Sequence, residues 1–438
     1  MKILLFLLFA TYSRAAIVKV RAGPGYDCAY CQPEQLHISF GSKTNDIVVT
    51  WSTFNDTTES RVQYGEGVMD KEAVGYSTLF TDGGPQRRSQ WIHRVVLKDL
   101  KYDTHYVYHA GSEYGWSEEF SFKTAPAGQD WVVRAAIFGD MGNKNAHSLS
   151  YLQDEAQRGH FDLILHVGDF AYDMHDDDAR VGDQFMRQLQ PLAAMLPYMA
   201  CPGNHEEAYN FSNYRARFSM PGPHESLFYS FDLGPIHFVS VSTELYYFLQ
   251  YGLKVLDNQY RWLEKDLSEA NKEENRRIRP WIVLYGHRPM YCSNLRDDCW
   301  NNYLPNRVGL PLLGLGMEPL LKQYGVDLVI WAHEHSYERL WPVYDEKVYN
   351  GSLEHPYTNP GAPVHIVTGS AGCQEKTDPF KPNPPVWSAF RSSDYGYTRL
   401  KAYNKTHIYM EQVDVDLKGK IIDSFWLIKD RHGAFTNL

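Results

Sequence analysis

Five apolar runs in this sequence end in side chains that could bind a metal ion or transfer a proton. The runs are RAAIFGD, LILHVGD, YMACPGNH, IVLYGH and DLVIWAHEH, and the groups at their ends are Asp140, Asp169, Asn204, His205, His287, His333 and His335. Tyr172 adds a phenol three residues after Asp169. Functional groups in open α/β sheets gather beyond the carboxyl ends of the strands, so we expect these side chains to converge.

The composition of this set indicates two metal ions rather than one. Without His205 it holds two carboxylates, a phenol, an amide and three imidazoles, which are hard to borderline ligands with no thiolate among them. Seven donors are too many for one tetrahedral zinc ion, but they suit two ions that share a carboxylate and leave positions for water and substrate. His333 and His335 stand two apart at a strand end, so they can serve neighbouring ions.

Each position also has an ordinary structural explanation when it is taken alone. Asp140 could be a turn residue, Tyr172 a half-buried aromatic, and His287 a hydrogen-bonded core histidine. Asn204 and His205 could form a turn with a helix cap. Because all five strand ends would have to carry such groups by coincidence, we interpret them as one site.

The elements that must position these groups fall into two regions with different patterns. From residue 33 to 125, short runs rich in Val, Tyr, Thr and Phe predict a small all-β sandwich. Residues 124–130 contain Pro and Gly and little to bury, so we expect the boundary there. From residue 131 to 438, apolar strands alternate with helical stretches, which predicts an α/β domain with a partly parallel sheet. We expect the β runs after residue 363 to complete this domain.

The N-terminus indicates a secreted or lysosomal protein, and the net charge bears on its partners. Residues 1–16 combine Lys2, an apolar stretch about half as long as a membrane span of ~20 residues, and small residues for cleavage, so we interpret them as a signal peptide. No second long apolar run follows, and we therefore expect no membrane span. The formal net charge of −10 argues against a nucleic-acid partner.

Six cysteines and four N-x-S/T triplets suit the secretory route. Cys292–Cys299 would close a short loop, and Cys28–Cys31 is feasible but tight, although the sequence alone cannot choose among the connectivities. A zinc site at Cys28 and Cys31 is the alternative, and it lacks a second thiol pair with that spacing. The triplets are candidate glycosylation sites at Asn55, Asn210, Asn350 and Asn404.

Five motifs resemble, in order and spacing, the metal-binding motifs of the purple acid phosphatases, a family of calcineurin-like metallophosphoesterases. They are GDMG (139–142), GDFAY (168–172), GNHE (203–206), YGH (285–287) and AHEH (332–335). The resemblance covers nearly the whole mature chain. It implies a fibronectin type III-like sandwich followed by a metallophosphoesterase-like α/β catalytic domain with mixed sheets flanked by helices. It also implies a secreted acid phosphatase that hydrolyses small phosphate monoesters.

The resemblance further implies a dinuclear centre of Fe(III) and a second divalent metal, which would be Zn, Fe or Mn. The ferric ion would be bound by Asp140, Asp169, Tyr172 and His335, and Asp169 would bridge to a second ion held by Asn204, His287 and His333. Tyrosinate on Fe(III) gives the family its purple colour, and the expected nucleophile is a metal-bound hydroxide. Trivalent iron lowers the pKa of bound water strongly, so we expect an acidic optimum. His205 is our candidate for stabilising the transition state or protonating the leaving oxygen, with an orienting role for the Asn204 loop as the alternative.

Two features depart from the family pattern. Ala332 stands where glycine is usual, and we expect little effect because a methyl group is small. Plant members carry histidines after the ligand that corresponds to His287, and these histidines contact the phosphate. The segment RPMYCSNLRDDCW has none here, so Arg288, Tyr291 and Arg296 are candidate replacements.

The remaining histidines of the first region, His37, His93, His105 and His109, are expected to be structural, and residues 175–178 to form a solvated acidic loop. Two other functions remain open. A metallophosphodiesterase or nucleotide pyrophosphatase could use the same fold, although Tyr172 favours the monoesterase family. An inert secreted binding protein would be expected to lack a ligand, and all seven are present. The natural substrate and the oligomeric state, a homo-oligomer included, are not determined by the sequence.

Overall fold

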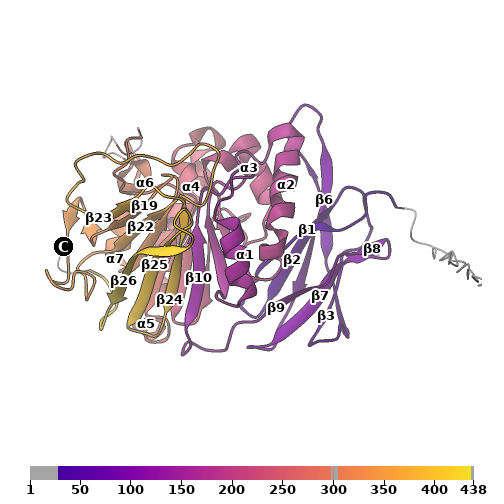
Figure 1. Cartoon of the computed structure of the whole chain (residues 1–438), viewed down its shortest axis with the longest axis horizontal. Coiled ribbons are helices and arrows are strands. Elements are labelled where there is room, and N and C mark those ends of the chain that lie inside the picture. Colours follow the sequence, from indigo (N-terminus) through magenta and orange to yellow (C-terminus); the bar gives the residue numbers. More distant parts are fainter. Residues whose placement is uncertain (1–27, 297–298, 300–303, 436–438) are drawn as a thin grey trace, which may run out of the picture.

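The computed structural model describes residues 28–296, 299 and 304–435, and the predicted signal peptide lies outside them. Figure 1 shows a β-sandwich at one end of the molecule and a larger α/β body at the other. Among the described residues, no helix is both long and apolar enough to cross a membrane. This arrangement confirms the fold class predicted from the sequence.

The sandwich consists of two antiparallel sheets. One has the order β1 (Glu34–Phe40), β2 (Ile47–Thr53), β6 (Ser89–Leu97) and β5 (Tyr76–Thr81). The other has the order β4 (Lys71–Val74), β3 (Arg61–Gly65), β7 (His105–Ser112) and β8 (Gly115–Trp116), and β9 (Phe120–Lys123) pairs with β7. Both faces of β2 are buried: Val49 and Trp51 lie in the hydrophobic core, and Thr50 and Ser52 on the opposite face are also out of solvent.

The first sheet of the α/β body joins two distant parts of the chain. Its order is β12 (Tyr198–Cys201), β11 (Leu163–Val167), β10 (Val133–Phe138), β24 (Gly396–Ala402), β25 (His407–Asp414) and β26 (Lys420–Ile428). The first three strands are parallel to one another, and the C-terminal three are antiparallel and continue the sheet beside β10.

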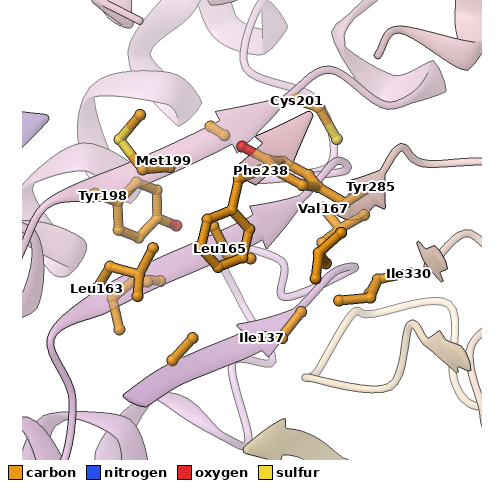
Figure 2. Packing of buried hydrophobic residues seen from close by; sticks show 14 of the residues in the cluster. Ile137, Leu163, Leu165, Val167, Tyr198, Met199, Cys201, Phe238, Tyr285 and Ile330 are labelled. Carbon is orange, nitrogen blue, oxygen red and sulfur yellow. The ribbon is translucent and has the colours of Figure 1, made fainter. Parts of the chain in front are cut away.

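The second sheet has the order β13 (Tyr229–Leu233), β14 (Ile236–Ser240), β15 (Trp281–Tyr285), β18 (Leu328–Trp331), β22 (Val364–Thr368), β19 (Tyr337–Leu340) and β23 (Ser388–Ser392). Strands β14, β15, β18 and β22 are parallel. Figure 2 shows apolar side chains of both sheets in one buried cluster, for example Leu165 and Val167 with Phe238 and Ile330. The parallel strands of the two sheets contribute their carboxyl-terminal loops to the site.

Helices connect the parallel strands. They are α1 (Leu149–Gln157), α2 (Asp176–Ala193), α3 (Ala208–Arg217), α4 (Leu253–Ala270), α5 (Glu273–Ile278), α6 (Pro305–Val308) and α7 (Glu318–Gln323). Three 3-10 turns are η1 (Asn204–Glu206), η2 (Thr243–Tyr246) and η3 (Leu249–Tyr251), and two short hairpins are β16 (Gly309–Leu310) with β17 (Gly314–Leu315) and β20 (Val343–Tyr344) with β21 (Lys347–Val348). The apolar face of α4, with Leu256, Leu263 and Leu267 buried, shows why this stretch forms a helix packed on the body.

A buried polar cluster joins the sandwich to the body. Asp183 of α2 is buried, accepts a hydrogen bond from Arg217 at 2.9 Å and forms an ion pair with Arg88, whose Nη2 atom lies 2.5 Å from Asp183 Oδ2. Asp178 is also buried and accepts a bond from the backbone N–H of Gln86 at 2.8 Å. The expectation of a fully solvated acidic loop is therefore wrong for Asp178, because the sandwich covers it.

Candidate metal centre

The loops after β10, β11, β12, β15 and β18 bring all seven predicted metal ligands into two adjacent groups. In the first group, the Tyr172 hydroxyl donates to Asp140 Oδ1 at 3.0 Å and lies 2.9 Å from His335 Nε2. His335 Nε2 is 3.5 Å from Asp140 Oδ1. Because all three side chains are buried, three donor atoms face one small volume.

The second group is arranged around the Nε2 atom of His287. This atom lies 3.1 Å from Asp169 Oδ2, 3.2 Å from Asn204 Oδ1 and 3.2 Å from His333 Nδ1. The backbone N–H of His333 donates to Asp140 Oδ2 at 2.9 Å, which connects the second group to the first. Asp169, His287 and His333 alone could hold a metal ion, since their donor atoms lie within 4.8 Å of one another.

The backbone at the strand ends aims these side chains into the site. Asp140, Asp169, Tyr172 and His333 have positive φ angles of 58°, 53°, 50° and 69°. Residues other than glycine rarely adopt this conformation, and it persists where the surrounding structure fixes it, most often at functional sites. Gly203 permits the tightest approach, because a Cβ atom there would lie 2.2 Å from Asp169 Oδ1.

The first departure from the family pattern is accommodated locally. Ala332 is fully buried, and its methyl group lies where a side chain on Gly139 would be, since a Cβ at position 139 would come within 2.4 Å of it. The glycine before Asp140 therefore makes room for the alanine before His333.

Burial raises the pKa of the acidic groups of the site, and the neighbouring histidines oppose this effect at the carboxylates. Burial raises the pKa of Asp140 and of the Tyr172 phenol. Burial acts in the same way on Asp169, but the positive charges of His287 and His205 outweigh it and hold the pKa of Asp169 well below its usual range.

The histidines show the complementary effect. Burial lowers the pKa of an imidazole, but the charge of Asp169 outweighs it and raises the pKa of His287 to about 9. The hydrogen bond to Asp140 outweighs burial in the same way and raises the pKa of His335 to about 11. The site thus requires positive charge in a volume that is closed to bulk water. Metal cations fit this requirement, because they would take the place of protons on these imidazoles.

Glu206 supports the site, although the sequence analysis assigned it no role. Its buried carboxylate accepts hydrogen bonds from the backbone N–H groups of Asp169, Phe170 and Gly203 at 2.9, 3.0 and 2.9 Å. These bonds hold the loop after β11 against the turn that carries Asn204. Its place in the motif GNHE was the signal that could have identified it.

Asp173 is a second supporting residue that the sequence analysis missed. Its Oδ1 atom lies 2.6 Å from His205 Nδ1, and His205 Nε2 lies 4.0 Å from Asp169 Oδ2. Burial lowers the pKa of His205, but the charges of Asp169 and Asp173 outweigh it and raise the pKa to about 10. One nitrogen of the ring is therefore held by Asp173, and the other faces the metal ligands. Glu375 stands at the rim, with Oε1 3.8 Å from His205 Nε2.

Four of the cysteines form the two disulfides that the sequence suggested, Cys28–Cys31 and Cys292–Cys299. Among the described residues, Cys201 and Cys373 are buried free thiols. Cys373 Sγ lies 3.5 Å from His335 Nδ1, so a sulfur atom stands beside the predicted iron ligands. Nothing in the local sequence indicates this proximity, because 38 residues separate Cys373 from His335.

The three candidate phosphate contacts occupy different places. Arg288 Nη1 lies 2.9 Å from His333 Nε2, and its Nε donates to the buried Glu244 at 3.0 Å. Tyr291 donates to Glu318, away from the ligands. Arg296 donates to Asp378 at 2.8 Å. Arg288 is thus the candidate whose guanidinium contacts a predicted metal ligand.

Three family models match successive parts of the chain. Residues 33–124 match the purple acid phosphatase N-terminal domain, residues 133–337 match the calcineurin-like phosphoesterases, and residues 362–424 match the iron/zinc purple acid phosphatase-like protein C. The matches follow the order of the sandwich, the site-bearing part of the body and the C-terminal strands.

Similar proteins cover almost the whole chain. Acid phosphatase type 7 of Danio rerio is 55% identical over 92% of each chain, and that of Homo sapiens is 50% identical over 94% of this chain and 98% of its own. Purple acid phosphatase 22 of Arabidopsis thaliana is 31% identical over 92% of this chain and 86% of its own. The solved structure of purple acid phosphatase PPD1 from yellow lupin seeds has a TM-score of 0.78 at 26% identity, and the match covers 91% of this chain and 75% of that one.

Proposed function

Because this chain belongs to the purple acid phosphatases and is an acid phosphatase by that membership, we propose that it hydrolyses small phosphate monoesters at a centre of two metal ions. The observation that carries the proposal is the arrangement of seven donor side chains in two adjacent groups. The groups are joined through the bond from the His333 N–H to Asp140 and through the buried surroundings they share.

We assign the ligands as the sequence predicted. Fe(III) would be held by Asp140, Asp169, Tyr172 and His335, and a divalent Zn, Fe or Mn ion by Asn204, His287 and His333, with Asp169 common to both. The hard carboxylates and the phenol suit a trivalent ion, and the imidazoles and the amide suit a borderline divalent one. Bound cations would supply charge neutralisation for the phosphoryl oxygens and would acidify a water molecule.

The residues of the chain provide proton transfer and orientation. We assign proton donation to the leaving oxygen to His205, whose Nε2 atom faces the ligands at 4.0 Å from Asp169 Oδ2. Asp173 holds the opposite nitrogen at 2.6 Å and so fixes the plane of the ring. Glu206 holds the loops of Asp169 and Asn204 together through its three backbone bonds.

Arg288 is our candidate for orienting the phosphate in place of the histidines of plant members. Its guanidinium lies beside His333 and is largely buried, with 13% of the side chain exposed. Glu244 fixes its Nε atom, and the ring of Tyr247 lies 4.3 Å from the guanidinium carbon. An arginine held in this way places a positive charge of fixed orientation beside the proposed ligand His333, which suits a phosphate dianion.

We further propose a secretory destination, extracellular or lysosomal, for the mature chain. The two disulfides form in oxidising compartments. The proposed glycosylation sites Asn55, Asn210 and Asn404 are exposed, and Asn350 is partly exposed. Residues 33–125 would form the sandwich, and residues 131–438 the catalytic unit.

The decisive experiment is a visible absorption spectrum of the purified secreted protein together with metal analysis of the same sample. We expect two metal ions per chain including iron, and a broad charge-transfer band that disappears in Tyr172→Phe. Tyr102→Phe is the matched control, because Tyr102 is exposed in the sandwich. A colourless protein fully loaded with zinc or manganese would refute the ferric centre, and faster hydrolysis of a phosphodiester than of p-nitrophenyl phosphate would favour the phosphodiesterase.

A further inference from the structure

Two segments that leave the active site enter the left-handed backbone region three residues at a time. Residues 177–179 have φ angles of 50°, 51° and 66°, and residues 209–211 have φ angles of 55°, 61° and 57°. None of these residues is glycine. L-residues visit this region singly rather than in runs, and such runs persist only where the surrounding contacts fix them. The first run begins five positions after Tyr172 and the second four positions after His205.

Both runs are contacted by one turn of the sandwich, residues 82–88 between β5 and β6, which we call the β5–β6 turn. Gly83 lies directly against the ring of Tyr209, because a Cβ atom at position 83 would meet the ring at 2.2 Å. The backbone N–H of Gln86 donates to Asp178 Oδ1 at 2.8 Å. Figure 1 shows the corresponding end of β6 beside α2. The sandwich, which contains no predicted metal ligand, therefore contacts both segments that leave the active site.

The turn is anchored by polar and apolar contacts. Asp82 is fully buried, and its carboxylate accepts bonds from Asn213 Nδ2 and from the backbone N–H of Gly84, both at 2.8 Å. Arg180 Nη2 donates to Gln86 Oε1 at 2.9 Å. Below the turn, Phe80 and Ile92 of the sandwich form a small buried cluster with Ala179 of α2.

The two contacted segments meet again at the catalytic residues. Asp173 of the first segment is bonded to His205 of the second at 2.6 Å. One step farther from the ligands, the ring of His175 lies edge-on to the ring of Tyr209, with 5.8 Å between their centroids. The segments thus run side by side from the metal ligands to the β5–β6 turn.

We propose that the β5–β6 turn is a positioning element of the active site. It holds residues 177–179 and 209–211 in their left-handed conformations and thereby fixes the segment of Tyr172 and Asp173 against the segment of His205. Asp82 and Gly83 are positioning residues, which act on turnover through these side chains without touching substrate. The inference rests on the roles proposed above for Tyr172 and His205.

The first test is Gly83→Val in the metal-loaded, full-length protein. The added side chain would displace the Tyr209 ring, so we expect kcat to fall by about tenfold or more, because small misplacements of catalytic groups cost this much. We expect KM to change less and the metal content to stay complete. Amide hydrogen exchange should become faster in residues 205–213. Pro85→Ala is the matched control, since Pro85 is exposed at the tip of the same turn.

An exchange of partners separates positioning from a general loss of packing. Asp82→Asn should lower kcat in the same way, because an NH2 donor would replace one of the two oxygens that accept from Asn213 and from the N–H of Gly84. Adding Asn213→Asp restores a donor–acceptor pair in the opposite sense and should recover most of kcat. The single variant Asp82→Asn and the double variant with Asn213→Asp also test the inference if Gly83→Val does not fold.

Either of two results would overturn the inference. One is faster exchange in residues 205–213 with unchanged kcat and KM, which would make the turn a structural contact only. The other is a loss of kcat that Asn213→Asp fails to recover at full metal content. Failure of the proposed function looks different, because the wild-type chain would then bind both metals and hydrolyse no phosphate monoester.

Discussion

Buried histidines occur in both regions of this protein, but their surroundings give them opposite properties. In the sandwich, burial lowers the pKa of His37 and of His93 to about 4 in each case. In the metal centre, the neighbouring carboxylates outweigh burial and raise the pKa of His287 to about 9 and that of His335 to about 11.

The difference lies in the groups that face each ring. His37 is bonded to the backbone carbonyls of Gln35 and Arg217, and His93 to the hydroxyls of Thr53 and Ser60, all of them neutral. The rings of the metal centre face carboxylates instead. Burial alone therefore does not set the pKa of a histidine, and the charge of its partners decides the direction of the shift. The structural role predicted for His37 and His93 is confirmed by these bonds.

The largest effect is expected when the metal centre loses its central negative charge. Asp169→Asn removes the carboxylate that faces His287 at 3.1 Å, so the imidazoles would lose both their raised pKa and their shared cation. We expect kcat/KM to fall by at least about a thousandfold, with fewer than two metals bound. Asp99→Asn is the control, since Asp99 is an exposed carboxylate of the sandwich. Retention of both metals and of activity in Asp169→Asn would contradict the assignment.

A smaller effect is expected at the histidine that we assign to proton transfer. His205→Asn should lower kcat by about a hundredfold, and Asp173→Asn by about tenfold, because Asp173 only holds the ring. The double variant should be no worse than His205→Asn, since the two residues act as one unit. Steady-state kinetics of all four proteins complete the cycle, and simple multiplication of the two effects would show that Asp173 acts independently of His205.

His237 offers a test of the same contrast without metal ligands. It lies between Asp232 at 2.7 Å and Asp266 at 3.0 Å, and these bonds outweigh burial and raise its pKa to about 9. The stabilisation by these two bonds is complete below pH 6.5, which is the pKa of histidine in the unfolded chain. It is lost as pH rises through about 9, the pKa in the folded chain. Over that window we expect the free energy of unfolding to fall by roughly 2 kcal/mol, and His237→Gln to remove the dependence. Denaturant titrations at several pH values measure it, with His105→Gln as the exposed control.

The smallest effect is expected at His93 in the sandwich, whose contribution to stability changes with pH in the opposite direction to that of His237. The pKa of buried His93 is about 4, so below pH 6.5 the unfolded chain binds a proton that the folded chain excludes. Stability therefore decreases as pH is lowered below 6.5. His93→Gln should lower the free energy of unfolding by about 1 kcal/mol at pH 7. The wild type should lose stability as pH falls below 6.5 and His93→Gln should not, so the difference should shrink and then reverse sign toward pH 4, with kcat unchanged. A difference that grows on acidification would contradict the neutral state of His93.

Much of the site could be predicted because its chemistry lies in short, local motifs. Asp140, Asp169, Asn204, His287 and His333 each follow an apolar run, and parallel strands bring their carboxyl ends together whatever the exact register. The supporting residues were harder to identify from the sequence. Glu206 and Asp173 act through bonds to other loops, and a carboxylate next to a motif looks the same whether it faces solvent or a buried partner.

The local sequence pattern predicted the two regions, the alternation of strands and helices, and the proposed set of metal ligands, because hydrophobic periodicity and strand-end residues are local properties. Which groups those side chains face depends on the tertiary structure. It placed Cys373 beside His335, covered Asp178 with the sandwich, and set the β5–β6 turn against residues 209–211. These contacts join residues that are far apart in the chain, and their geometry depends on how the sheets and helices pack rather than on any local pattern.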